Sequence, residues 1–341
     1  TTTGNGTCLA VTDVMNITIT PAPVVDAGSD QTLCSNNAEV TLNGSVTIAT
    51  GGQWTGGLGT FTPNATDLNA VYTPTQTEIN TGTLTLTLTS TGNGDCVAEA
   101  DEVTINFTPT PTVNAGSNQT VCANNADVTL NGSVTVATGG TWSGGAGTFT
   151  PDANTLGATY TPSAAEITSG SVTLTLTTTG NGNCIAVSDE MDITITPAPT
   201  VSAGSNQVVC ANDPDVQLNG VVSVATGGTW SGGSGSFSPD ATALNAVYTP
   251  SATEISNGTV LLTLTTTGNG NCVAETDVME ITVTPAPVVN AGPDQTLCDN
   301  NATAQLAGSV TIASGGQWSG GLGTFTPSST DLNAEYTPSS A

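Results

Sequence analysis

The sequence predicts an all-β protein made of tandem immunoglobulin-like β-sandwich modules that together form an elongated rod. Three observations predict this fold class. The chain repeats itself every 88 residues, apolar residues alternate with threonine in short runs, and clusters rich in Gly and Asn separate those runs. A fixed repeat period indicates a repeat architecture, whatever the role of any single residue.

The 88-residue period is carried by tryptophan and cysteine. Successive members of each series are always 88 residues apart, so the module repeats without insertion or deletion between these positions. The series are Trp54, Trp142, Trp230 and Trp318; Cys8, Cys96, Cys184 and Cys272; and Cys34, Cys122, Cys210 and Cys298.

Pro-x-Pro pairs recur at the same interval and mark the expected joints, because proline stiffens an extended segment. Cutting there gives three complete modules, 23–110, 111–198 and 199–286. Residues 1–22 are then the C-terminal part of a truncated module, and 287–341 the N-terminal part of another. We expect the sequence to be a window from a longer array of modules. As an alternative, residues 1–22 complete the truncated module of a neighbouring chain by strand complementation.

Within each module the strands are predicted from alternation with period two. Runs such as TLTLTLT (83–89), VTLTLTT (172–178), VLLTLTT (260–266) and MDITIT (191–196) place Leu, Val and Ile on one face and mostly Thr on the other. Turn clusters, TGNG and GGxWTGGxG or GGxWSGGxG, separate them. About seven short strands per module indicate a β-sandwich. Helix is expected only as one turn near Ala164 to Ile167.

The string AGSNQTVCANNADVTLNGSVTVATGGTWSGGAGTFTPDANTLGATYTP (115–162), followed by LTLTTTGNGNC (174–184), resembles the repeats of giant surface proteins of Bacteroidota. Those are immunoglobulin-like or PKD-like modules of gliding-motility and other adhesins exported by the type IX route. The similarity covers the whole chain. It implies an extracellular cell-surface or filament role and names no ligand.

The charge balance excludes several functions. The chain has 27 acidic side chains and no Lys, Arg or His, a formal net charge of -27. Nucleic-acid binding needs cations, and imidazole-dependent nucleophilic catalysis needs histidine. An acidic pair repeated in every module argues against a single active site, so no enzyme is expected. No apolar run is long enough for membrane insertion of this fragment, and the first residues carry no secretion signal.

The regular cysteines predict disulfides and therefore an oxidising, extracellular location. Zinc is not expected without His or CxxC spacing. Pairing within a module is preferred because each module then folds as a unit: Cys34–Cys96, Cys122–Cys184 and Cys210–Cys272. The alternative clamps each joint through Cys34–Cys184 and Cys122–Cys272. It stays open because an immunoglobulin-like topology puts the two cysteines of a module at opposite poles, whereas a disulfide needs Cα atoms within about 7 Å.

The tryptophans Trp54, Trp142, Trp230 and Trp318 are expected to fill the module cores, although aromatic residues among glycines can also stack on sugars. Asp127, Asp213 and Asp215 are weak candidates for calcium ligands in Asn- and Asp-rich loops. No other cofactor is expected.

We therefore predict a structural repeat region of a secreted surface adhesin or extracellular filament, acting as a stiff disulfide-stabilised stalk. Its expected partners are other modules of the array, and possible ones are surface glycans or a filament neighbour. Two alternatives remain: a repeated glycan- or calcium-binding module, and a filament subunit that polymerises through its incomplete ends.

Overall fold

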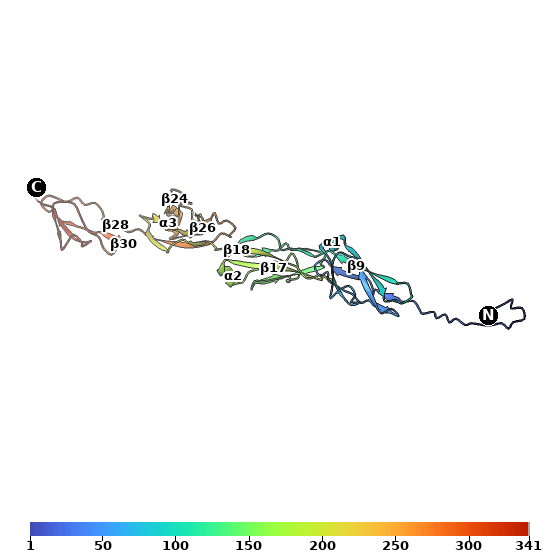
Figure 1. Ribbon diagram of the computed structural model, residues 1–341. Helices are drawn as coiled ribbons and strands as arrows, with labels where there is room; N and C mark the ends of the chain where they lie inside the picture. Colours follow the sequence, from blue (N-terminus) through green and yellow to red (C-terminus); the bar gives the residue numbers. More distant parts are fainter. Residues whose placement is uncertain (340–341) are drawn as a thin grey trace. The chain divides into compact units, whose positions relative to one another are not determined.

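The computed structural model describes residues 1–339. It is nearly all β, with short helices only (Figure 1). The chain divides into two compact units, one of residues 1–119 with 127–194 and the other of 120–126 with 195–341. Segment 120–126 is thus separated from the rest of its module and grouped with the unit that contains Cys272.

The first module shows the strand order of an immunoglobulin-like sandwich. One sheet has the order β2-β9-β8-β5, with β2 parallel to β9 and the other pairs antiparallel, and a second has the order β3-β7-β6. The first strand is split: β1 pairs with β4 in a separate two-stranded sheet, whereas β2 is an edge strand of the four-stranded sheet. The elements are β1 (Val24–Asp26), β2 (Gln31–Cys34), β3 (Val40–Thr41), β4 (Ser45–Thr47), β5 (Gly51–Thr55), β6 (Thr60–Thr62), β7 (Val71–Thr73), α1 (Gln76–Thr81), β8 (Thr83–Thr91) and β9 (Ala100–Thr108).

The second module repeats these elements with the same spacing. Strand β17 pairs with both β14 and β18, and β16 pairs with both β12 and β15. Its elements are β10 (Thr112–Asn114), β11 (Gln119–Cys122), β12 (Val128–Thr129), β13 (Ser133–Thr135), β14 (Gly139–Ser143), β15 (Thr148–Thr150), β16 (Thr159–Thr161), α2 (Ala164–Ser169), β17 (Ser171–Thr179) and β18 (Ser188–Thr196).

In the third module the larger sheet has the order β20-β27-β26-β23 and the smaller one β21-β25-β24. Its elements are β19 (Thr200–Ser202), β20 (Gln207–Cys210), β21 (Val216–Gln217), β22 (Val221–Ser223), β23 (Gly227–Ser231), β24 (Ser236–Ser238), β25 (Val247–Thr249), α3 (Ala252–Asn257), β26 (Thr259–Thr267) and β27 (Thr276–Thr284).

The alternation predicted from the sequence decides which side chains form each core. On β8 the buried apolar side chains are Leu84, Leu86 and Leu88, whereas the threonines between them are exposed or half-buried. Trp54 on β5 lies opposite Leu88 and is only 1% exposed. Burial of this apolar face supplies most of the driving force for folding of each module, because the chain has no cationic side chain and therefore no salt bridge with Lys or Arg.

The two end pieces are less complete. Residues 1–22 form no strand, and their apolar side chains are largely exposed, among them Val14, Met15, Ile17 and Ile19. In the described part of 287–341 the strands are β28 (Val288–Asn290), β29 (Ala304–Gln305), β30 (Ser309–Thr311), β31 (Thr324–Thr326) and β32 (Glu335–Thr337), which correspond to β1, β3, β4, β6 and β7. Trp318 is accordingly only half-buried, beside a cavity lined by Gly308 and Leu332.

A strained residue recurs between the fourth and fifth strands of each module. Val136 has φ of 66°, in a region that β-branched residues rarely adopt, and the amide of Ala137 donates to Thr135 O at 2.7 Å across it. Ile48, Val224 and Ile312 share this conformation. These side chains are more than half exposed, so packing recovers little of the strain.

We expect Val136→Gly to raise the free energy of unfolding of the second module by about 1 kcal/mol, because glycine adopts positive φ without steric cost. Urea denaturation measures the change. Thr135→Gly, at the adjacent strand position, is the control and should destabilise the module instead. Destabilisation by both substitutions would show that the valine is not strained.

Candidate functional site: the disulfide joints

The two disulfides join neighbouring modules, not residues of one module. Cys34 bonds Cys184 with a Cα–Cα distance of 4.8 Å, and Cys122 bonds Cys272 at 5.0 Å. The preferred pairs Cys34–Cys96, Cys122–Cys184 and Cys210–Cys272 are therefore wrong, and the clamp alternative is correct.

The topology explains the error. Strand β2 runs parallel to β9, and Cys34 lies opposite Thr108, at the end where the chain leaves the module. Cys96 lies in the turn that precedes β9, at the opposite end of this nine-residue strand. A strand of that length separates the two cysteines by about 30 Å, far beyond the reach of a disulfide.

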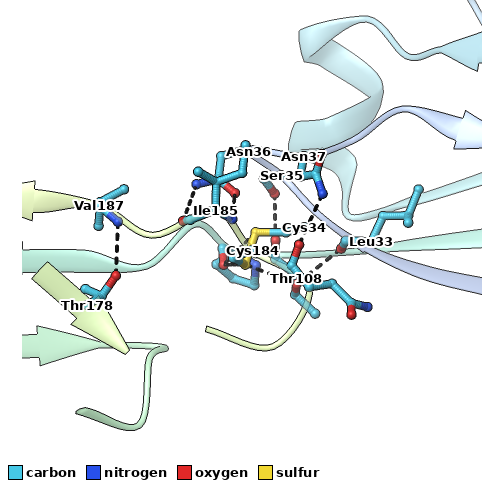
Figure 2. The surroundings of a disulfide bond; sticks show 12 residues. Leu33, Cys34, Ser35, Asn36, Asn37, Thr108, Thr178, Cys184, Ile185 and Val187 are labelled. Atoms are coloured by element: carbon cyan, nitrogen blue, oxygen red, sulfur yellow. Dashed lines mark hydrogen bonds between the residues drawn. A yellow bond between two sulfur atoms is a disulfide. The ribbon is translucent and has the colours of Figure 1, made fainter. Parts of the chain in front are cut away.

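Paired hydrogen bonds surround the first disulfide, as Figure 2 shows. The side chain of Asn36 donates to the backbone oxygen of Ile185 at 2.9 Å and accepts from the Ile185 amide at 3.1 Å. From the other side of the joint, Asn183 donates to Thr32 O at 2.7 Å. Asparagine suits this role because its amide both donates and accepts. The turn of one module thus docks against the loop after β2 of the preceding one.

The linker is part of the same joint. The carbonyl of Pro109, from the Pro-x-Pro pair, lies 3.6 Å from Cys184 Sγ and 3.8 Å from Cys34 Sγ. The backbone amide and the hydroxyl of Ser35 both donate to Thr108 O, at 2.9 and 2.8 Å. The loop after β2, the Pro-x-Pro linker and the turn that carries Cys184 therefore meet at one place, where the disulfide bonds the loop to the turn.

The second joint has the same construction. Asn124 donates to Val273 O at 3.0 Å and accepts from the Val273 amide at 3.2 Å. Asn271 donates to Thr120 O at 3.2 Å, as Asn183 does to Thr32. One contact is additional, from Asn124 to a carboxylate oxygen of Glu275 at 2.7 Å. Recurrence of the contacts shows that the joint is encoded in the repeat.

The four remaining cysteines are free: Cys8, Cys96, Cys210 and Cys298. Two of them have the surroundings of a half-joint. Cys96 lies 3.6 Å from Pro21 O and 3.4 Å from the Thr20 hydroxyl, as Cys184 lies beside Pro109 and Thr108. Cys210 lies 3.8 Å from Pro285 O, the distance between Cys34 and Pro109 O. Both thiols are therefore placed as their bonded counterparts are.

A buried carboxylate anchors the helix of each module. Glu166 Oε1 accepts from the Ala146 amide at 2.6 Å and from the Tyr160 hydroxyl at 2.8 Å, and its Oε2 accepts from the Ser163 amide and hydroxyl at 2.7 and 2.9 Å. Ser163 caps helix α2 and forms a capping box with Glu166. Glu78 and Glu254 make corresponding contacts. All four donors are uncharged, so this network replaces an ion pair.

Burial raises the pKa of the Glu166 carboxyl, but the hydrogen bonds it accepts together outweigh burial and hold that pKa below its ordinary value. Burial, followed by the bond to Glu166, raises the pKa of Tyr160 to about 12. The recurring glutamate is thus an ionised structural acceptor beside a neutral tyrosine.

We expect Glu166→Gln to lower the free energy of unfolding of the second module by about 2 kcal/mol at pH 7, because the amide group cannot accept where its NH2 replaces a carboxylate oxygen. Since the folded-state pKa of Glu166 is lowered, its stabilisation is present above the unfolded-state pKa and is lost as the pH falls through the folded-state value. The difference between wild type and variant should therefore shrink below about pH 4. Denaturation at pH 7 and pH 3.5 measures it, and a difference independent of pH would contradict this account.

The other recurring acid closes a backbone turn. In each complete module, an aspartate carboxylate accepts a hydrogen bond of 2.8 Å from the backbone amide that follows the first strand. The pairs are Asp101 with Ala27, Asp189 with Ala115, and Asp277 with Ala203. Asp13, in the exposed first segment, instead accepts from the adjacent Val14 amide. Both recurring acids, the glutamate beside the helix and the aspartate after the first strand, therefore have structural partners.

The calcium candidates do not converge. Asp127 accepts from the Thr161 hydroxyl and Asp215 from the Thr249 hydroxyl, each at 2.7 Å, while Asp213 pairs through its backbone with Cys210. Within residues 1–339, no group of three or more His, Cys, Asp or Glu residues is arranged to hold a metal ion. In the same part of the chain, no helix is long and apolar enough to cross a membrane.

The tryptophans of the complete modules are inaccessible to a ligand. Trp54, Trp142 and Trp230 are 1–2% exposed, and the indole of Trp142 donates to Leu156 O at 3.2 Å. A sugar ring cannot stack on a buried indole. These three indoles therefore cannot serve the glycan-binding alternative.

Sequence reasoning missed the asparagines of the joint and the function of the buried glutamates. Both left a signal. Asparagine recurs two residues after each cysteine of one series, at Asn36, Asn124, Asn212 and Asn300, and a capping box is visible where Thr75, Ser163 and Ser251 each precede a glutamate by three residues. A fixed asparagine beside a fixed cysteine indicated a defined partner for that loop.

No family model and no curated protein matches this chain. Among solved structures, it is similar to a three-domain immunoglobulin fragment of titin, with 11% identity, a TM-score of 0.40 and coverage of 78% of this chain and 100% of that one. It is also similar to a protocadherin gammaB7 fragment (12%, 0.35, 94% and 92%) and to mouse cadherin-23 (14%, 0.34, 78% and 99%). These are tandem domain arrays. All three TM-scores are low, so the assignment of the fold depends on the strand order described above.

Proposed function

We propose that this chain is a repeat region of a secreted adhesin or extracellular filament, in which it serves as a stiff spacer. The observation that carries the proposal is the joint itself. Each disulfide, with its flanking asparagines, fixes one module to the next at a position that recurs every 88 residues. Such a joint suits a protein whose task is to hold a distance.

The disulfides fit an extracellular location, since thiols stay reduced in the cytosol. The resemblance of residues 115–162 and 174–184 to repeats of Bacteroidota gliding-motility adhesins supports export by the type IX route and display at the cell surface. Adjacent repeats are the partners that we propose. Cys96 and Cys210 would bond to further modules of the same kind, because each already occupies one half of a joint.

Strand complementation is less well supported as a second function. The exposed apolar side chains of residues 1–22 would suit it. However, residues 1–22 form no strand and pair with none of the described sheets.

Small-angle X-ray scattering of the oxidised chain tests the spacer role. A compact globule of 341 residues has a radius of gyration of about 20 Å, and we expect at least twice that value. The C34S/C184S and C122S/C272S variants are the comparison, and each should give a broader distribution of interatomic distances than the wild type. A value near 20 Å, or variants that scatter as the wild type does, would refute the proposal.

A further inference from the structure

The two disulfides overlap along the chain. Each links cysteines 150 residues apart, whereas the module repeats every 88 residues. Cys122 therefore lies inside the loop closed by Cys34–Cys184, and Cys184 lies inside the loop closed by Cys122–Cys272. The loops share residues 122–184. Pairing within modules would instead have given separate loops.

Overlap changes the path that tension takes when the chain is pulled by its ends. The shortest covalent path runs from residue 1 to Cys34, crosses to Cys184, returns to Cys122, crosses to Cys272 and continues to residue 341. It contains 33, 62 and 69 residue steps in turn, 164 altogether, compared with 340 in the reduced chain. At about 3.6 Å per residue these paths span about 590 and 1,220 Å.

We propose that the overlapping disulfides are a tension strap that limits extension of the array and shields most of the first and third modules from force. Residues 35–121 and 185–271 lie outside the shortest path. In the first module, every buried core residue except Ala27 falls within the first shielded segment. A pull on the ends of an oxidised chain therefore cannot draw that segment out. The strap depends on disulfide connectivity alone, so it would hold even if the spacer role failed.

Single-molecule force spectroscopy of residues 1–341, attached through terminal tags, tests the strap. We expect a fully stretched length of about 590 Å for the oxidised wild type and about 1,220 Å after reduction. Removing either bond, in C34S/C184S or in C122S/C272S, should lengthen the path by only 26 residues, about 94 Å. Removing both should lengthen it by 176 residues, about 630 Å. This strong non-additivity is the signature of overlapping loops.

C96S is the matched control, because it removes a thiol that is free in the structure. It should leave the stretched length unchanged. Pairing within modules would instead give a gain of 62 residues, about 220 Å, in C96S, because the Cys34–Cys96 bond would be lost. That gain, or additive gains from the two double variants, would overturn the proposal. Neither outcome depends on how stably the variants fold, because the fully stretched length is set by covalent connectivity.

Discussion

Removing the Cys34–Cys184 bond is expected to lower the free energy of unfolding of the first unit by up to about 5 kcal/mol, because the bond closes a 150-residue loop and the chain-entropy term grows with loop length. This exceeds the effect of the shorter loops that pairing within modules would close. Urea denaturation of C34S/C184S, followed by tryptophan fluorescence, measures the loss. Reduction of the wild type should reproduce it for both units.

The control for this loss is C8S/C298S, which replaces two exposed, free cysteines and should leave the denaturation midpoint unchanged. Connectivity is checked separately by peptide mapping under non-reducing conditions. Trypsin has no site in a chain without Lys or Arg, so proteases that cut at acidic residues are needed. Equal midpoints for C34S/C184S and the wild type, with the bond shown to be present in the latter, would contradict the stabilising role.

The repeat and the alternation were sufficient to predict the fold. Leu84, Leu86 and Leu88 are buried as the pattern of period two required, and α2 forms where one helical turn was expected. Such features depend on local sequence, since a strand with one apolar face has one stable orientation against a core. Repetition of the module strengthened each local signal.

The joint could not be predicted in the same way, because it depends on which pole of the module each cysteine occupies. That was decided by the parallel pairing of β2 with β9, which joins residues 74 apart in sequence, as Gln31 and Ile105 are. A preference for modules that fold as units favoured Cys34–Cys96, whereas strand direction excludes it. The clamp alternative contained the correct argument, that the two cysteines lie at opposite poles.

Replacing Trp142 by alanine is expected to lower the free energy of unfolding of the second module by about 3 to 5 kcal/mol, the usual cost of truncating a buried aromatic side chain. The indole is 2% exposed and tightly packed. Gly132 approaches it so closely that an added Cβ would lie 2.9 Å from the ring and 2.7 Å from Leu176. The cavity left by alanine cannot readily collapse against a backbone fixed by the β-ladder. Denaturation of W142A measures the loss.

Trp318 is the matched control for this core role, because the same residue in the last, partial module is only half-buried. Trp318→Ala should therefore cost clearly less than Trp142→Ala, since the cost grows with the buried apolar volume that the truncation removes. If the tryptophans served as sugar-stacking platforms, both variants would instead stay stable and glycan binding would fall. A stable W142A with reduced glycan binding would therefore restore the glycan-binding alternative. A destabilised W142A would support the structural role on which the spacer depends.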